Sequence, residues 1–242
     1  MKYYGDLNFQ IKDDLSPLTQ ADLASHQEIV SFLSKYSTHL VCSEEAILSN
    51  EVRQSSEYLW LVDPLDGTKD FLAQNDEFCI NIALIYQQRP ILGVIGIPAK
   101  NEIYFAIQGE GAFCYQNQVL RKITFNSQAN QRIFACISHH HHTDQTQAFI
   151  TKYNLDTISL GSAIKFCALA EGRVDFYPRF NGSSEWDSAA GDLIVSECGG
   201  EILSVDSKEP LLYNKPIMRN PYFVGFSQKQ IKKEVYLDFI KR

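Results

Sequence analysis

The chain has 242 residues, of which 45% are hydrophobic and 21% charged, values that are ordinary for globular proteins and exclude disordered and fibrous classes. Lys and Arg number 22 against 29 Asp and Glu, so the net charge is −7, whereas proteins that bind duplex nucleic acid usually carry a basic surplus. A protein this acidic needs bound cations if it handles anionic substrates.

The six cysteines lie far apart in apolar or strand-like segments and form no CxxC pair. We therefore expect reduced core thiols rather than a disulfide framework. The N-terminal stretch is too polar for a signal peptide, and no segment approaches the ~20 apolar residues of a membrane span. These features predict a cytoplasmic protein; peripheral association with the inner face of the membrane is left open.

The first third of the chain predicts one long helix among short strands. Thr19 is expected to cap a helix over residues 20–36, because Asp22 stands three positions later and the apolar residues that follow keep helical spacing. The predicted strands cover residues 9–12, 40–42 and 58–62. The last strand should end at Asp63-Pro64, since proline cannot continue a sheet ladder.

The remainder divides into two patterns. Between residues 78 and 124, β-rich runs alternate with turn-like segments, which predicts an antiparallel meander; the runs are 78–86, 91–97, 103–107 and 111–115. Beyond about residue 130, strands and helices alternate in the manner of α/β proteins. The predicted strands are 133–137, 157–160, 174–177 and 201–205, and the helices are 146–153, 163–171 and 188–198. We expect an N-terminal metal-binding lobe over 1–130 and a C-terminal substrate lobe over 131–242, joined in one globular unit with the active site between them.

The segment WLVDPLDGTKDF (60–71) carries the most informative motif. Asp63 and Asp66 bracket a strand end, with a proline between them and a glycine that permits a tight turn after them. Two close carboxylates raise each other's pKa unless a cation lies between them, and their oxygens, with the carbonyl of Leu65, suit Mg²⁺. A generic DxxD is more simply a solvated turn, but the surrounding residues favour the metal site.

Four further acids could complete the cluster: Asp22, Glu44, Glu45 and Asp187. Each has a plainer alternative, with Glu44 and Glu45 as surface charges and the other two as helix caps. Considered with the motif at 60–71, they form one pattern of metal-binding carboxylates.

This pattern resembles the inositol monophosphatase-like superfamily of Mg²⁺-dependent, lithium-sensitive phosphomonoesterases, and within it the CysQ-type 3′(2′),5′-bisphosphate nucleotidases. The likeness rests on DPLDGTKDF and WDSAAG (186–191) and covers nearly the whole chain. Its other shared phrases are SPLTQAD (16–22), SEE (43–45), EVRQ (51–54), EFCINIALI (77–85) and GSAIKFCALAEGRVDFYPRF (161–180). It implies an α/β fold of layered αβαβα type.

The resemblance also implies two or three Mg²⁺ ions per active site. The ligands it assigns are carboxylates and one backbone carbonyl: Glu44, Asp63 and Leu65 for the first ion, and Asp63, Asp66 and Asp187 for the second. Asp22, Glu45 and Thr68 would orient the attacking water and a third, weaker metal. In such a two-metal hydrolysis, one ion lowers the pKa of a water while the other neutralises charge on the leaving oxygen.

Substrate choice is expected to depend on the second half of the chain. Lys165 and Arg179 fit a second phosphate, which an inositol monophosphate lacks; the alternative for Lys165 is a surface lysine with its ammonium in water. Within the run His139–His142, His141 is the expected nucleotide contact. The remaining substrate contacts expected from the resemblance are Gly67, Thr68, Gly161, Ser162 and Asp187.

The expected reaction removes the 3′-phosphate of adenosine 3′,5′-bisphosphate to give AMP and phosphate, with the sulfated precursor as a further substrate in sulfur metabolism. The alternatives are a phosphatase for inositol phosphates or fructose 1,6-bisphosphate, and a non-catalytic metal or nucleotide sensor. The expected partner is a small nucleoside bisphosphate, and a homodimer is left open. Relatives usually carry a further helix before the segment matching Tyr3-Tyr4-Gly5, and the sequence leaves open whether this chain lacks it. Residues 206–242 carry no motif that we interpret.

Overall fold

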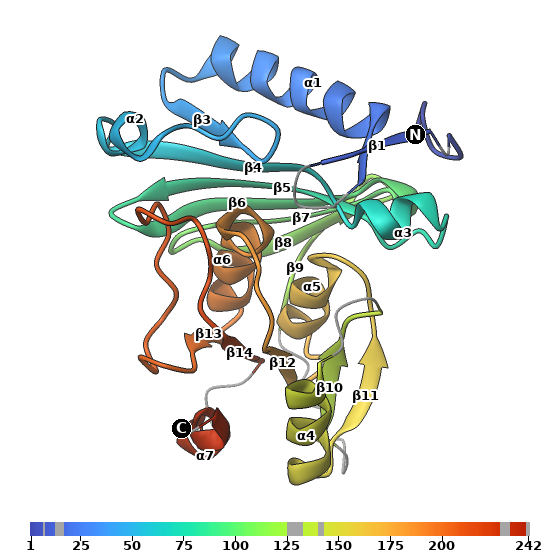
Figure 1. Ribbon diagram of the computed structural model, residues 1–242, viewed down its shortest axis with the longest axis vertical. Coiled ribbons are helices and arrows are strands. Elements are labelled where there is room, and N and C mark those ends of the chain that lie inside the picture. The colour runs from blue at the N-terminus through green and yellow to red at the C-terminus, as the bar shows by residue number, and fades with distance from the viewer. Residues whose placement is uncertain (7, 13–16, 125–132, 140–142, 228–232, 241–242) are drawn as a thin grey trace.

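The computed structural model describes residues 1–6, 8–12, 17–124, 133–139, 143–227 and 233–240. They form a seven-stranded sheet in the order β3-β4-β5-β6-β7-β8-β9, a five-stranded sheet in the order β11-β10-β12-β14-β13, and a two-stranded ribbon. The ribbon consists of β1 (Phe9–Ile11) and β2 (Pro17–Thr19), which pair antiparallel. Helices lie outside and between the two large sheets (Figure 1), which confirms the layered αβαβα arrangement.

Helix α1 (Gln20–Tyr36) has the predicted bounds and covers the outer face of the seven-stranded sheet (Figure 1). It begins at a capping box: the Thr19 side chain accepts hydrogen bonds from the N–H groups of Ala21 and Asp22, and the Thr19 N–H donates to Asp22 Oδ2 at 2.8 Å. Further along the helix, Leu33 packs in one apolar cluster with Trp60 of β4. Near the start of the helix, Oγ of Ser25 donates to the carbonyl of Pro64 at 2.7 Å, which ties this end of α1, and with it Asp22, to β4.

The seven-stranded sheet contains the predicted meander and one strand that was not predicted, β9. Its strands are β3 (Leu40–Ser43), β4 (Tyr58–Asp66), β5 (Cys79–Tyr86), β6 (Arg89–Ile97), β7 (Glu102–Ile107), β8 (Gly111–Gln116) and β9 (Val119–Lys122). Only the pair β3–β4 is parallel among the pairs of this sheet that the structure describes. Three short helices flank these strands: α2 (Asn50–Gln54), α3 (Thr68–Leu72) and the 3₁₀ helix η1 (Pro98–Lys100).

The predicted end of β4 near Val62 is wrong, because the strand continues to Asp66. Asp63 pairs with Asn81 and Asp66 pairs with Cys79, with a register shift between them. Pro64 falls inside this irregularity, where the strand has no regular ladder partner. Proline is tolerated at such a bulge although it cannot donate a ladder hydrogen bond.

The five-stranded sheet comes from the second half of the chain. Its strands are β10 (Phe134–Ile137), β11 (Asp156–Ser159), β12 (Phe176–Arg179), β13 (Glu201–Ser204) and β14 (Phe223–Phe226). The strand predicted at 174–177 begins two residues later. Just before it, the Asp175 side chain accepts a hydrogen bond from the N–H of Phe134, and the Asp175 N–H donates to the Phe134 carbonyl. The side chain therefore takes the place of a backbone carbonyl in the bond to Phe134. Strand β14 lies in the segment without an interpreted motif.

Helices α5 (Ile164–Ala170) and α6 (Ala189–Glu197) form the middle layer between the two sheets (Figure 1). A Cβ placed on Gly191 would lie only 2.3 Å from Cγ of Phe166, so the glycine allows α6 to approach α5 closely. The other helices are α4 (Asp144–Tyr153), α7 (Lys233–Leu237), η2 (Glu185–Asp187) and η3 (Asp238–Ile240).

Two expectations about the chain as a whole can be compared with this fold. All six cysteines are free, five of them buried and Cys198 half-buried, as predicted for reduced core thiols. Within the described residues, no helix combines the length and apolar character needed to cross a membrane. The division into lobes at residue 130 stays a prediction.

Candidate active site

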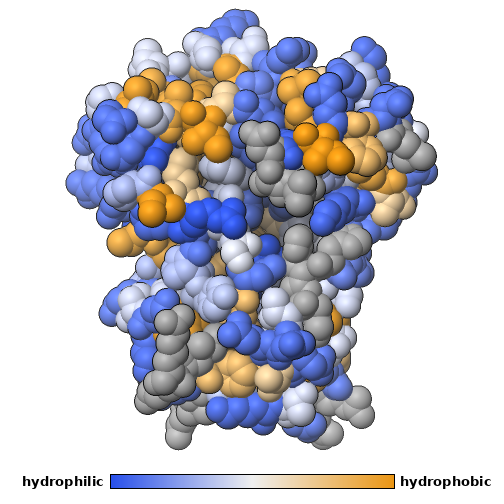
Figure 2. Space-filling model, in the orientation of Figure 1, coloured by the Kyte–Doolittle hydropathy of each residue, from blue (hydrophilic) through white to orange (hydrophobic). Residues whose placement is uncertain are grey.

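A cavity of about 420 Å³ lies where the two halves of the molecule meet. Strand β4, helix α3, the turn at 161–163 and the segment 182–188 contribute its lining. In Figure 2, hydrophilic residues lie over much of the face shown, including the region between the upper and lower parts of the molecule. A polar cleft between two sheets is a usual place for a small-molecule site.

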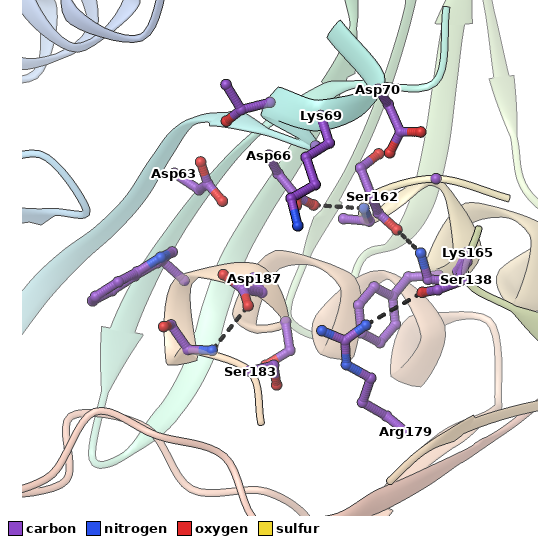
Figure 3. Close-up of a pocket in the computed structure, with 18 of the residues that line it drawn as sticks. Asp63, Asp66, Lys69, Asp70, Ser138, Ser162, Lys165, Arg179, Ser183 and Asp187 are labelled. Atoms are coloured by element: carbon purple, nitrogen blue, oxygen red, sulfur yellow. Dashed lines mark hydrogen bonds between the residues drawn. The ribbon is translucent and has the colours of Figure 1, made fainter. Parts of the chain in front are cut away.

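Asp63 and Asp66 enter the cavity from the irregular end of β4 (Figure 3). The Asp63 side chain is 2% exposed, and its Oδ1 accepts a hydrogen bond from the N–H of Leu65 at 3.1 Å. Burial raises the pKa of Asp63, and the charges of Glu44, Asp66 and Asp187 raise it further. Carboxylates from three separate segments therefore lie close enough to act on one another electrostatically.

Only one oxygen of Asp66 is held by protein donors among the described residues. Its Oδ2 accepts from the N–H of Ala163 at 2.6 Å and from Nδ2 of Asn81 at 3.3 Å. Burial raises the pKa of Asp66, while the charge of Lys165 opposes this. The bonds to Oδ2 fix the orientation of the carboxylate.

Asp187 faces Asp63 and Asp66 from the opposite side of the cavity (Figure 3). It ends the short turn η2, and its Oδ2 accepts from the N–H of Ser184 at 2.8 Å. Asp187 is not the N-cap of α6, because Ser188 occupies that position. Burial, followed by the charges of Asp66 and Glu44, raises the pKa of Asp187 to about 7.

Lys12 forms ion pairs with both Glu44 and Glu45, and it was not predicted from the sequence. Its Nζ lies 2.8 Å from Oε1 of Glu44 and 2.6 Å from Oε1 of Glu45. Burial raises the pKa of Glu45, while the hydrogen bond and charge of Lys12 oppose this. The Glu45 side chain is only 7% exposed, so it is no surface charge; of the two acids, Glu44 lines the cavity.

The donor set suits a hard divalent cation, although its members are not gathered into one closed cage. Five carboxylates line the cavity. One is Asp70, and we call the other four, Glu44, Asp63, Asp66 and Asp187, the acidic wall; Leu65 lines the cavity beside them. Oxygen donors of this kind are the preferred ligands of Mg²⁺. Among the described residues, no three His, Cys, Asp or Glu side chains converge closely enough to make a complete metal site by themselves.

Thr68 and Asp22 meet beside the acidic wall. The Thr68 hydroxyl lies 3.4 Å from Oδ1 of Asp22 and 3.3 Å from the carbonyl of Leu65. Burial raises the pKa of Asp22, while the hydrogen bonds from Thr19 oppose this. Thr68 lines the cavity together with Gly67, whereas Asp22 and Glu45 lie outside its lining.

Lys165 and Arg179 both line the cavity, as expected for substrate contacts. Lys165 is 2% exposed, which excludes the alternative of a surface lysine, and its ammonium donates to the carbonyls of Leu160 at 3.1 Å and Ser162 at 2.6 Å. Arg179 donates to Oγ of Ser138 at 3.3 Å (Figure 3). Contact of either residue with a second phosphate stays a prediction.

Two further cations line the cavity and were missed. Lys69 extends from α3 into the cavity (Figure 3), and Arg219 donates to Oγ of Ser184 at 3.1 Å. We call Lys69, Lys165, Arg179 and Arg219 the basic wall. The sequence signal for Lys69 was its position in DGTKDF, whereas Arg219 falls in the segment without a motif.

The turn that contains Gly161 and Ser162 is tied to the histidine segment by Glu77. Oε2 of Glu77 accepts from the N–H of Gly161 at 2.6 Å and lies 2.7 Å from Nε2 of His139. A Cβ on Gly161 would lie 2.5 Å from the Glu77 carbonyl oxygen, so glycine is required there. His139 lines the cavity; the predicted contact His141 lies outside the described residues.

Comparison with known proteins places this site in a family. Residues 2–236 match the inositol monophosphatase family model. The chain belongs to the inositol monophosphatase family. It is 38% identical over 215 residues to the 3′(2′),5′-bisphosphate nucleotidase CysQ of Escherichia coli strain K12, in a match that spans 88% of this chain and 86% of that protein. The family predicted from the motifs is confirmed.

Solved structures confirm the fold. The crystal structure of CysQ from Bacteroides thetaiotaomicron, described as a bacterial member of the inositol monophosphatase family, superposes with a TM-score of 0.83 at 38% identity, over 90% of this chain and 88% of that one. The IMPase of Thermotoga maritima gives 0.80 at 26% identity, over 98% and 89% of the two chains.

Proposed function

We propose that this chain is a Mg²⁺-dependent phosphomonoesterase that hydrolyses the 3′-phosphate of adenosine 3′,5′-bisphosphate to AMP and phosphate, and also accepts the sulfated precursor. One observation carries the proposal: an acidic wall and a basic wall face the same cavity of about 420 Å³. The acids suit metal ions at a reacting phosphate, and the cations suit a second phosphate on the same molecule. The relatives named 3′(2′),5′-bisphosphate nucleotidase, at 38% identity, support this choice.

The acidic wall would hold the metal. Glu44, Asp63 and the Leu65 carbonyl form one ligand group, and Asp63, Asp66 and Asp187 form a second; a third, weaker position would lie near Asp22, Glu45 and Thr68. Bound Mg²⁺ supplies a water of lowered pKa and neutralises charge on the leaving oxygen. Nζ of Lys12 lies 2.8 Å from Oε1 of Glu44. When a metal ion binds Glu44, the ammonium of Lys12 must therefore either move away or remain bound to the same carboxylate beside the ion.

Thr68 and Asp22 would orient the attacking water. If the Thr68 hydroxyl donates to Asp22, its oxygen lone pairs remain free to accept a hydrogen bond from that water. Asp22 is 2% exposed and its pKa is raised by burial, so it can accept a proton more readily than an exposed aspartate. Water, hydroxyl and carboxylate then form one path for the proton.

The basic wall would select the substrate. Arg179 presents a guanidinium that suits a phosphate oxygen pair, and Lys69 adds a further positive charge to the lining. Gly161 and Ser162 would lie against the ribose or base. Inositol 1-phosphate carries a single phosphate and would leave most of these cations without a phosphate to bind.

A phosphate-release assay with Mg²⁺ tests the proposal. The panel is adenosine 3′,5′-bisphosphate, its sulfated precursor, inositol 1-phosphate and fructose 1,6-bisphosphate, with AMP identified by chromatography. We expect the highest kcat/KM for the adenosine bisphosphate, loss of activity with EDTA, and inhibition by millimolar lithium. Faster turnover of inositol 1-phosphate or the sugar bisphosphate would overturn the substrate, and phosphate release unchanged by EDTA would overturn the metal dependence.

A further inference from the structure

A buried arginine connects the N-terminal half of the chain to the segment 214–216. Arg53 of α2 is 2% exposed. Its guanidinium donates to the carbonyl of Leu48 at 3.2 Å, to Oδ1 of Asn214 at 2.7 Å, and to the carbonyls of Lys215 at 3.0 Å and Pro216 at 3.2 Å. A buried guanidinium is tolerated only when its donors are paired, and here one side chain binds two chain segments that are about 160 residues apart.

Glu185 binds the same segment from the other side. It is completely buried, and its carboxylate accepts from the N–H groups of Asn214 and Lys215 and from the Lys215 ammonium. Removing one partner of such a buried pair leaves an uncompensated charge. The segment 214–216 is therefore held between Arg53 and Glu185, and the ammonium of Lys215 pairs with the Glu185 carboxylate.

Glu185 begins the turn that Asp187 ends. In a 3₁₀ helix each residue advances by about a third of a turn, so side chains two positions apart leave in different directions. Glu185 is directed into the 214–216 segment, while Asp187 faces the cavity (Figure 3). The contacts of Glu185 consequently fix the rotation of the turn, and this rotation sets where the Asp187 carboxylate lies.

The other end of the connection reaches the strand that precedes Glu44. Leu48, whose carbonyl accepts from Arg53, donates its N–H to Sγ of Cys42 in β3 at 3.5 Å. Glu44 follows directly after β3. Neither Arg53 nor Glu185 lines the cavity, so neither is placed to touch substrate.

We propose that Arg53 and Glu185 are positioning residues of the metal centre. Acting through the segment 214–216, they hold Asp187 at its working distance from Glu44, so that acids from the two halves of the chain serve one metal site. This inference rests on the proposed Mg²⁺-dependent function. Partners that orient metal ligands from outside the coordination sphere typically change metal affinity 10- to 100-fold when removed.

The test measures Mn²⁺ binding to the full chain by calorimetry without substrate, together with the Mg²⁺ dependence of phosphate release and Tm. For Glu185→Gln we expect Mn²⁺ affinity to fall about tenfold. The Mg²⁺ concentration for half-maximal rate should rise by the same factor, with kcat at saturating Mg²⁺ within about twofold. Arg53→Lys, which keeps the charge but not the forked donors, should weaken Mn²⁺ binding in the same direction.

Glu171→Gln is the matched control. Glu171 is a carboxylate with two arginine partners, Arg121 and Arg173, and lies outside the cavity lining. We expect it to lower Tm without changing Mn²⁺ affinity. If Glu185→Gln and Arg53→Lys behave like this control, the positioning role is wrong while the proposed function stands. If the unmodified chain binds no Mn²⁺ and releases no phosphate, the proposed function fails as well.

Discussion

The hydroxyl of Thr68 lies 3.4 Å from Oδ1 of Asp22, although the two residues are 46 positions apart. The capping box of α1 holds the other oxygen of Asp22, because the Thr19 N–H and hydroxyl both contact Oδ2, at 2.8 and 2.6 Å. The helix start therefore directs Oδ1 towards Thr68. A structural cap and a proposed catalytic contact share one carboxylate.

This geometry predicts that Thr68→Ala lowers kcat by about 10²–10⁴-fold, the usual contribution of a positioned proton acceptor, while KM changes little. Steady-state kinetics with adenosine 3′,5′-bisphosphate measure the effect. Thr68→Ser retains the hydroxyl and should keep most of the activity. Equal activity of the alanine and serine variants would exclude the hydroxyl from the reaction.

Replacing Asp63 with asparagine should abolish phosphate release while leaving the fold intact. Asp63 is 2% exposed and its pKa is raised by burial and by three neighbouring acids, so the neutral amide removes repulsion from the metal-free protein. We expect activity to fall more than about 100-fold, beyond the range for partners outside the coordination sphere, and Tm without metal to rise at pH 8. Full activity of this variant would remove the basis of the metal assignment.

Stability of the metal-free protein should fall as pH rises. Burial raises the pKa of Asp187 to about 7, and the pKa of Asp63 and Asp66 is raised too. These acids bind protons more tightly when folded than when unfolded, where the pKa is about 3.9. As the pH rises from about 4 to about 7, these three acids lose protons that the folded state binds more tightly, so their contribution to the free energy of unfolding falls.

Thermal unfolding in EDTA at pH 5 and pH 8 checks this sign. We expect a lower Tm at pH 8, and a larger increase in Tm on adding Mg²⁺ at pH 8 than at pH 5, because metal ligands must be deprotonated. The Asp63→Asn variant should show a smaller fall in Tm between the two pH values. A Tm that rises between them in EDTA would contradict the raised pKa values.

Arg179→Met should separate substrates with one and two phosphates. A hydrogen bond to a charged group contributes about 1.5–3 kcal/mol, which is about 10–100-fold in affinity. We expect KM for adenosine 3′,5′-bisphosphate to rise by that factor and KM for 3′-AMP, which lacks the second phosphate, to change by less than about threefold. Equal increases for both substrates would place Arg179 at the reacting phosphate.

Gly191→Ala should destabilise the fold, because its Cβ would lie 2.3 Å from Cγ of Phe166 in the middle layer. Overpacking of a core costs about 1–3 kcal/mol, measured by urea unfolding. Gly96→Ala is the control: Gly96 lies in β6, and a Cβ added there would meet no heavy atom of a non-adjacent described residue within 4 Å. A similar loss in both variants would show that the close packing of α5 and α6 is not the cause.

The motif-bearing parts of the site could be predicted because their signals are local. Asp63 and Asp66 stand three residues apart beside a buried strand, and Thr19 with Asp22 forms a capping pattern within four residues. Lys12 and Arg219 could not be found in this way, because each comes to the site by the folding of a segment without a motif of its own. Only the tertiary structure shows that Lys12 contacts two acids more than 30 residues away.

The secondary structure that was missed also has physical reasons. Strand β9 has four exposed residues and lies at the sheet edge, so its sequence has no alternation between buried and exposed positions. Strand β14, at Phe223–Phe226, is buried throughout and contains a glycine. It therefore also lacks the alternation between buried and exposed positions by which a strand is predicted. The predicted end of β4 failed because the rule against proline in a ladder does not foresee a bulge.

The bulge in β4 has a consequence for how this sequence can change. Side chains of a regular strand alternate between faces, so residues 63 and 66, separated by an odd number of positions, would point to opposite sides of the sheet. The extra residue of the bulged strand opposite β5 cancels that mismatch and brings both acids to one side. Gaining or losing a single residue between them would turn one acid towards the outer helix, so this stretch can exchange side chains but cannot change its length.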